Sequence, residues 1–194
     1  MCGIAGKIDL AGNHDSAIHK MVEHLGHRGP DSEGFFVHKG IEFGMCRLAL
    51  IDVSSGQQPV FDETERFVLV FNGEIYNFVE LTRLLKDKGH KFKSKGDAEV
   101  LVHLFEEFGK DLVHHIRGMY AIAVYDLQNS KLTLITDRFG KKPILWAEPK
   151  SGQFIFASEF KSLSKGLPDS FSINPNLNAI LQVFELGYIS APQT

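Results

Sequence analysis

Apolar residues recur along the chain with two spacings, one typical of strands and the other of helices. The segment Gly3–Asp9 (GIAGKID) alternates apolar and small residues and predicts a strand that begins almost at the first residue. Residues 67–75 (FVLVFNGEI) predict a second, more strongly apolar strand. Further apolar runs come in pairs around turn residues and predict β-hairpins, with turns at 39–40, 129–130 and 150–152.

Apolar side chains spaced three and four residues apart predict four helices. One covers residues 16–25 and precedes the turn-rich loop HRGPDSEG, and another covers Asp97–Phe108 with a continuous apolar stripe. A third begins after Asn77, which we interpret as an N-cap with Glu80 as its partner in a capping box, and ends at Gly89.

The fourth predicted helix lies near the end of the chain. Asn174 is its expected N-cap, Pro175 its first residue, and Gly187 its end. Its apolar face is wide and carries Leu177, Ile180, Leu181 and Phe184. A surface of this kind usually marks an interaction site, so we expect it to face another domain or a neighbouring chain.

The order of these elements runs from strands to helices and back to strands, with hairpins in place of regular βαβ units. This order favours the α+β class, with mostly antiparallel sheets and helices packed on them.

Composition and charge narrow the class of protein. The chain has 194 residues, 43% of them apolar, which is enough for a full core and excludes a mainly disordered chain. The formal charge is −3, and positive and negative residues are interspersed along the chain. The sequence therefore has no basic patch of the kind that binds nucleic acid or a membrane surface. With two cysteines, no apolar run long enough to span a bilayer and no signal-peptide pattern, we expect a cytoplasmic protein.

Cys2 is the unusual residue, because it directly follows the initiator methionine and precedes a strand. Removal of Met1 would make it N-terminal. Its own α-amine, with a pKa of about 7.7–8.0, would then be suited to act as the general base for its thiol. An N-terminal nucleophile needs no separate catalytic histidine. A chance cysteine at a frayed terminus is the alternative.

Several further motifs accompany Cys2 in a fixed order. Together with MCGIAG they resemble the glutaminase domain of glutamine-hydrolysing asparagine synthetases, a class II glutamine amidotransferase of the N-terminal-nucleophile hydrolase type. The resemblance covers about residues 2–165. Its other motifs are HRGPD (27–31), RLALID (47–52), FNGEIYN (71–77), GDAEV (96–100), DRFGKKP (137–143) and ASEFKSL (157–163).

The resemblance implies a fold and a reaction. The fold is a four-layer α/β/β/α sandwich with two mostly antiparallel sheets. The reaction is hydrolysis of L-glutamine to L-glutamate and ammonia, through a γ-glutamyl thioester on Cys2. Asn72 and Gly73 would form the oxyanion hole, which a tetrahedral intermediate of acyl transfer requires.

The resemblance also implies a binding site for the zwitterion of glutamine. Arg47 would hold the α-carboxylate, with the backbone of Leu50 and Ile51 lining the site. Asn72 and Gly73 would contact the amide, and Glu74 and Asp97 would accept hydrogen bonds from the substrate ammonium group. A cation at one end and anions at the other match an amino acid.

No cofactor or metal is expected in this chain, since the histidines have no zinc spacing with cysteine and no GxxxxGK[ST] loop is present. Residues 1–165 are expected to form the glutaminase domain, and 166–194 an extension toward a missing synthetase domain that would use ATP and Mg²⁺ to make asparagine from aspartate. A homodimer is compatible with the resemblance. The open alternatives are an amidotransferase that serves a different ammonia acceptor and a non-catalytic module that retains the fold.

Overall fold

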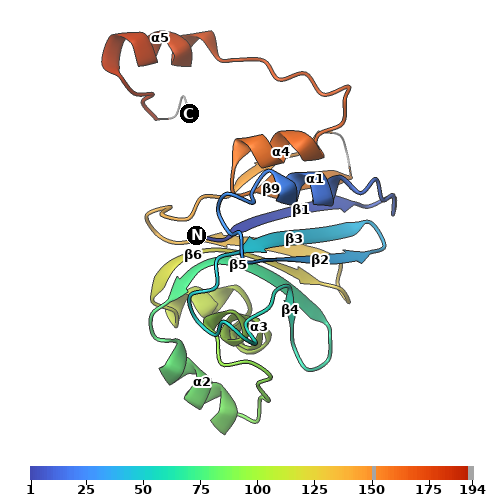
Figure 1. Ribbon diagram of the computed structural model, residues 1–194, viewed down its shortest axis with the longest axis vertical. Coiled ribbons are helices and arrows are strands. Elements are labelled where there is room, and N and C mark those ends of the chain that lie inside the picture. Colours follow the sequence, from blue (N-terminus) through green and yellow to red (C-terminus); the bar gives the residue numbers. More distant parts are fainter. Residues whose placement is uncertain (150–151, 192–194) are drawn as a thin grey trace.

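The structure is a computed structural model that describes residues 1–149 and 152–191. Within these residues, strands form two sheets whose strand pairs all run antiparallel. The two sheets stack face to face, with helices on both outer sides (Figure 1). None of the helices in the described residues is long and apolar enough to cross a membrane.

The first sheet has the strand that begins almost at the first residue at its centre. Its order is β2 (Ser32–His38), β3 (Ile41–Arg47), β1 (Gly3–Asp9), β9 (Gln153–Ala157) and β8 (Leu145–Ala147). All seven residues of β1 are buried. Ala5 lies opposite Gly44 on one side and Ala157 on the other. The start of the chain is therefore held in the middle of a sheet.

The second sheet contains the most apolar strand of the chain. Its order is β4 (Val60–Phe61), β5 (Phe67–Ile75), β6 (Gly118–Asp126) and β7 (Lys131–Thr136). Side chains alternate across β5, so Val68 and Val70 join the core between the sheets, whereas Leu69 and Phe71 join the core under the helices. The same alternation places position 72 on the inter-sheet side.

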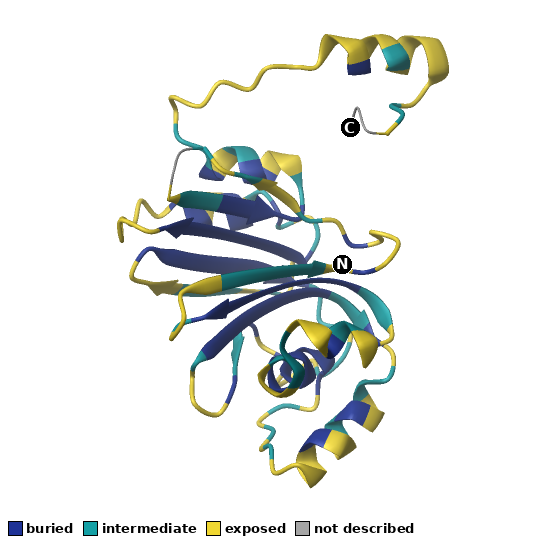
Figure 2. Cartoon of the chain, turned by 180° about the vertical axis from the view of Figure 1, so that it is seen from behind, coloured by how far each residue is buried: buried dark blue, intermediate teal, exposed yellow. Residues whose placement is uncertain are grey.

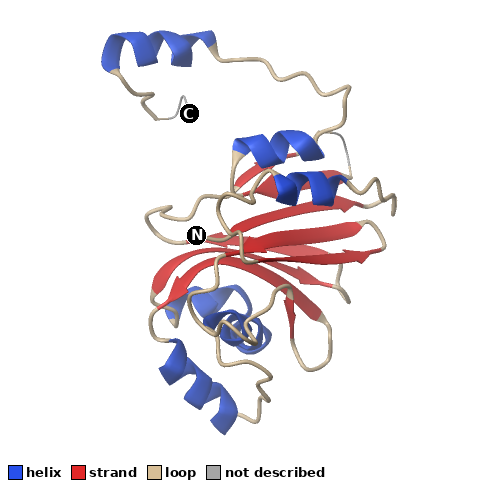
Figure 3. Cartoon of the chain, viewed as in Figure 1, coloured by secondary structure: helices blue, strands red, loops and turns tan. Residues whose placement is uncertain are grey.

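Helices complete the four layers, as Figure 3 shows in blue and red. The first sheet is covered by α1 (Ala17–Glu23) and α4 (Phe160–Gly166). The second sheet is covered by α2 (Phe78–Asp87), α3 (Asp97–Phe108) and the 3-10 helix η1 (Gly109–His114). The predicted α+β class and α/β/β/α sandwich are confirmed.

The helix α5 (Leu177–Leu186) lies away from the layers at the end of an extended segment (Figures 1 and 2). Ala179 is its one buried residue in the described chain, whereas Phe184 is 84% exposed. The wide apolar surface predicted for this helix is thus uncovered in the structure. Its start differs from the prediction: Asn176, not Asn174, is the N-cap, because the Asn176 side chain accepts hydrogen bonds from the first free N–H groups.

The capping box predicted at Asn77 is wrong, although α2 does begin at Phe78. The Asn77 side chain donates to the His115 carbonyl at 2.9 Å and accepts the Arg117 N–H at 2.9 Å, so it joins two loops and makes no hydrogen bond that caps the helix. The hairpin between β8 and β9 forms as predicted, but residues 150–151 of its expected turn lie outside the described residues.

Candidate active site

Cys2 lies directly before the central strand β1, and Leu48 and Arg28 hold it in position. The Leu48 N–H donates to the Cys2 sulfur at 3.4 Å, and the thiol donates to the Leu48 carbonyl at 3.7 Å. Arg28 Nε donates to the Cys2 carbonyl at 2.9 Å, and Arg28 Nη1 forms an ion pair with Glu159 at 2.7 Å. Both the backbone and the sulfur of Cys2 are therefore held from the side of the first sheet.

Asn72 brings a buried amide to the same region from the second sheet. It is 1% exposed, and its Nδ2 has no hydrogen-bond partner among the described residues. Buried donors in native proteins are nearly always paired, so this one indicates a ligand. Next to it, Gly73 allows close packing against β6, since a Cβ there would lie 2.1 Å from the Met119 carbonyl oxygen.

Arg47 ends β3, and its guanidinium holds the loop that follows. It donates to the carbonyls of Ile51 (3.0 Å), Asp52 (2.6 Å) and Val53 (3.3 Å). The loop passes so close to it that a Cβ on Gly56 would lie 2.5 Å from Nη2. Three of the five guanidinium N–H groups are used in this way, whereas Nε–H and the second Nη1–H make no side-chain hydrogen bond within the described residues.

Glu74 of β5 and Asp97 of α3 bring two carboxyl groups to the site from the second sheet and its helical layer. Burial, followed by the charge of Asp97, raises the pKa of Glu74. Burial also raises the pKa of Asp97, although its Oδ2 accepts the Ile75 N–H at 3.0 Å. A cationic group placed between the two carboxyl groups would stabilise the charged form of each.

Burial shifts the pKa values of two further groups near the start of the chain, the Cys2 thiol and the Lys142 amine. Burial raises the pKa of the Cys2 thiol, while the Leu48 N–H and the nearby positive charges lower it less. Lys142 is 4% exposed, and burial lowers its pKa. Its Nζ lies 2.6 Å from the Met1 sulfur, while Met1 itself is 59% exposed. Burial of Cys2 thus favours the protonated thiol.

A small cavity of about 30 Å³ joins these residues. Seven of the eight predicted site residues line it: Cys2, Arg47, Leu50, Ile51, Gly73, Glu74 and Asp97. The eighth, Asn72, precedes Gly73 on β5 and is not part of the lining. A larger cavity of about 660 Å³ is lined mainly by apolar side chains from β1, β7 and β9 and contains none of the predicted site residues.

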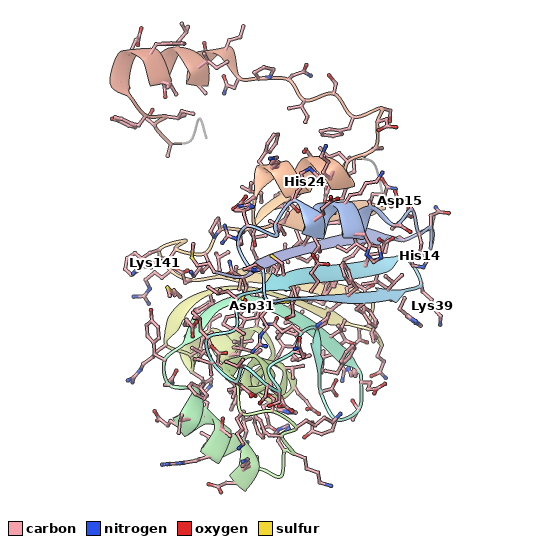
Figure 4. All side chains as sticks on the ribbon, in the orientation of Figure 1. His14, Asp15, His24, Asp31, Lys39 and Lys141 are labelled. Carbon is pink, nitrogen blue, oxygen red and sulfur yellow. The ribbon has the colours of Figure 1, made fainter. Side chains whose placement is uncertain are left out.

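Some residues of the site were not singled out by the sequence analysis. Gln58 lines the cavity, and its Oε1 accepts the Phe71 N–H at 2.7 Å. Glu159 and Lys142 belong to motifs that were noted, but nothing in their spacing shows that they approach the start of the chain. Asp31, which Figure 4 labels, accepts the Ala49 N–H at 2.8 Å and thereby supports the loop after Arg47.

The labelled residues His14, Asp15 and Lys39 lie at the other end of the first sheet from the chain start (Figure 4). There, His14 Nε2 accepts the Gly40 N–H at 3.0 Å and Nδ1 lies 3.4 Å from Glu42. His14 thus supports the β2–β3 turn, whereas Asp15 pairs with Lys7 of β1, and none of these residues lines the cavity of the candidate site.

Comparison with known proteins identifies the family of the chain. The family model for the glutamine amidotransferase domain matches residues 1–194. Asparagine synthetase [glutamine-hydrolyzing] 2 of Bacillus subtilis (strain 168) is 42% identical over 168 residues, which are 84% of this chain and 22% of that protein. Asparagine synthetase [glutamine-hydrolyzing] 1 of the same organism is 35% identical, over 100% of this chain and 31% of that protein.

Solved structures show the same fold at low sequence identity. The glutamine phosphoribosylpyrophosphate amidotransferase from B. subtilis, complexed with ADP and GMP, superposes with a TM-score of 0.71 at 19% identity. The match covers 85% of this chain and 43% of that one. The chain spans less than a third of the length of the two asparagine synthetases. It belongs to the glutamine amidotransferase domain family.

Proposed function

We propose that the chain hydrolyses L-glutamine to L-glutamate and ammonia, with Cys2 as the nucleophile after removal of Met1. The observation that carries the proposal is Asn72 Nδ2, a buried donor without a hydrogen-bond partner among the described residues, next in the chain to Gly73, which lines the cavity that contains Cys2. An oxyanion that forms during attack on an amide would supply the missing acceptor.

The nucleophile acquires its base when Met1 leaves. Met1 is exposed, so a peptidase can reach it, and the new α-amine would belong to Cys2 itself. With a pKa of about 7.7–8.0 this amine is a base near neutral pH, and it can take the proton of a thiol whose pKa burial has raised.

The reaction then proceeds in two steps. The Cys2 sulfur attacks the side-chain carbonyl carbon of glutamine, and the oxyanion accepts hydrogen bonds from Asn72 Nδ2 and the Gly73 N–H. The amide nitrogen takes the proton from the α-ammonium group and leaves as ammonia, which forms the γ-glutamyl thioester. Water adds to the thioester carbonyl, and the thiol departs with glutamate as product.

The ends of the substrate are recognised by opposite charges. Arg47 has two guanidinium N–H groups without a side-chain hydrogen bond in the part of the chain that the structure describes, and these would bind the α-carboxylate. Leu50 and Ile51 line the same cavity. Glu74 and Asp97 face it with carboxyl groups for the ammonium end. Both carboxyl groups have raised pKa values before substrate binds, and a bound ammonium group would lower them again.

The wider role concerns parts of the protein outside this chain. We propose that residues 1–165 carry the reaction and that 166–194 connect to a synthetase domain, which would use the ammonia, ATP and Mg²⁺ to make asparagine from aspartate in the cytoplasm. The uncovered apolar surface of α5 supports such a contact, or one in a homodimer. Delivery of ammonia to a different acceptor is the second candidate.

Replacement of Cys2 tests the proposal. Cys2→Ala should abolish glutamate release from glutamine, whereas Cys46→Ala should retain it. Cys46 is buried, and its thiol donates to the Leu25 carbonyl at 2.9 Å, away from the cavity. A glutamine-like electrophile should label Cys2 in the native chain, as peptide mass spectrometry would show. Labelling at Cys46, or full activity in Cys2→Ala, contradicts the assignment.

A further inference from the structure

A second cluster of chemically active side chains lies in the helical layer over the second sheet. It consists of Glu63 from the β4–β5 turn, His90 from the α2–α3 loop, and His103 and Glu106 from α3. Each offers one nitrogen or oxygen, and these four atoms all lie within 4.8 Å of one another. We propose that these four residues form a zinc-binding site.

The spacing of the four groups suits a tetrahedral ion. Zn–N and Zn–O bonds of about 2.0–2.1 Å place neighbouring ligand atoms about 3.3 Å apart. His90 Nδ1 lies 3.3 Å from Glu63 and 3.7 Å from Glu106, and His103 Nδ1 lies 3.1 Å from Glu63. Two imidazoles with two carboxylates form a mixed nitrogen and oxygen set, which zinc accepts.

His103 provides an independent sign that a ligand is missing. Its side chain is 1% exposed, yet neither ring nitrogen has a hydrogen-bond partner in the described chain. Glu63 is within 3.1 Å of Nδ1 but lacks hydrogen-bond geometry, and Glu99 is 3.8 Å from Nε2. A histidine buried only for packing would normally pair at least one nitrogen. A cation in front of Nδ1 accounts for the arrangement.

Hydrogen bonds from residues around the cluster orient two of the proposed ligands, His90 and Glu63. His90 Nε2 hydrogen-bonds to Glu107 at 3.2 Å, so its Nδ1 is left to face the cluster. Metal-binding histidines usually make this second contact to a carboxylate. Glu63 Oε1 accepts the Lys91 N–H at 2.8 Å, which fixes the carboxylate between the two imidazoles. No lysine or arginine of the described residues forms an ion pair with Glu63 or Glu106.

The site would be structural. Four protein groups fill a tetrahedral zinc ion and leave no open position for chemistry. Solvent still reaches the cluster, since the side chains of Glu63 and Glu106 are about a third exposed. The ion would join the β4–β5 turn and the α2–α3 loop to α3. The first residue of α3 is Asp97, so the metal would stiffen one wall of the active-site cavity.

Metal content and thermal unfolding test the proposal on the full 194-residue chain. The chain is stripped with EDTA, freed of EDTA and then given Zn²⁺; one equivalent of Zn²⁺ per chain should be retained through desalting, as measured by plasma mass spectrometry. At a free Zn²⁺ concentration 100-fold above the Kd, the unfolding temperature should rise by about 5–10 °C. A chain that retains no zinc, or whose unfolding temperature does not respond, overturns the site.

Variants assign the ion to these residues. His90→Gln should weaken Zn²⁺ binding by more than about 100-fold. Glu107→Gln, which alters the outer contact to His90 and the ion pair with Lys88 but removes no ligand, should weaken it by about 10- to 100-fold. His114→Gln is the matched control, because this histidine is exposed in the same layer, outside the cluster. Should His90→Gln fail to fold, Glu106→Gln removes a ligand from a partly exposed helix position.

Substitution of Co²⁺ for Zn²⁺ tests which residues bind the metal. Co²⁺ bound here should show visible d–d bands without a thiolate charge-transfer band, since no cysteine takes part. Zinc binding that is equal in the native chain and His90→Gln, or a thiolate band, would place the metal elsewhere and refute the proposal. Neither readout depends on glutamine hydrolysis.

Discussion

Replacement of Asn72 by leucine should make the protein more stable and much less active. Asn72 is 1% exposed, and its Nδ2 has no partner in the described chain, so the burial of this donor group is uncompensated. An unpaired buried polar group costs about 1–3 kcal/mol, and leucine has nearly the same shape without that group. The free energy of unfolding should therefore rise by up to this amount. For a chain of this size, each kcal/mol raises the unfolding temperature by about 2–4 °C.

The same change should remove one of two donors to the oxyanion. Loss of one such donor typically lowers kcat by about 10²–10³, or about 2.7–4 kcal/mol of transition-state stabilisation. The KM for glutamine should change little, because the donor acts on charge that develops during attack. Stability and activity should thus move in opposite directions from a single substitution.

Two measurements on matched variants check this reasoning. Thermal and urea unfolding give the stability, and release of glutamate from glutamine gives the rate. Asn77→Leu is the control, since its amide has partners at His115 and Arg117, and its removal should lower the stability. An Asn72→Leu protein that unfolds at a lower temperature than the native chain, or that keeps more than a tenth of its kcat, refutes the reasoning.

Other contacts lead to further predictions. Arg47→Lys keeps the charge, but a lysine cannot bind three loop carbonyls and a carboxylate at once. Steady-state kinetics should therefore show the KM for glutamine raised about 10- to 150-fold. An unchanged KM would remove Arg47 from the binding site. Hydrogen bonds from Arg66 and from the turn after β6 hold the pKa of Asp126 well below its ordinary value. Asp126 therefore stabilises the fold above about pH 4, and this contribution is lost as the pH falls toward its folded-state pKa. Asp126→Asn should lower the urea midpoint at pH 7, with a gap that narrows below pH 4; a constant gap across this range would contradict the assignment.

Much of the fold could be predicted because local pattern and tertiary packing agree. The strand Gly3–Asp9 and the helix Asp97–Phe108 have the predicted bounds, and the hairpins turn where predicted except within residues 150–151. The spacing of apolar residues shows which face of an element is buried, so such elements can be predicted from the sequence. The helix predicted over residues 16–25 is shorter, at Ala17–Glu23, since helix ends depend on neighbours as well as on spacing.

The errors arose where a side chain had a choice of partners. Asn77 has the sequence signature of a cap, but its amide bonds to backbone groups 38 and 40 residues further along the chain. Competition between distant backbone groups and the helix end for the same side chain cannot be predicted from local residue spacing. The pairing of His90 with Glu63 has the same character, because a turn and a loop far apart in sequence meet beside α3. Arg47, Glu74 and Asp97 could be placed only through the resemblance, since their spacing alone does not show that they share a cavity.

The position of β1 also determines when the site can exist during synthesis. Its partner β3 leaves the ribosome early, but β9, which pairs Ala157 with Ala5, follows about 150 residues later. At about 5–20 residues per second, this interval lasts roughly 8–30 s. Throughout it, the central strand lacks one neighbour, and Glu159, which anchors Arg28 against the Cys2 carbonyl, has not yet been made. On the proposed mechanism, the nascent chain would therefore gain activity only after β9 and Glu159 have been made, and the same interval would be open for removal of Met1.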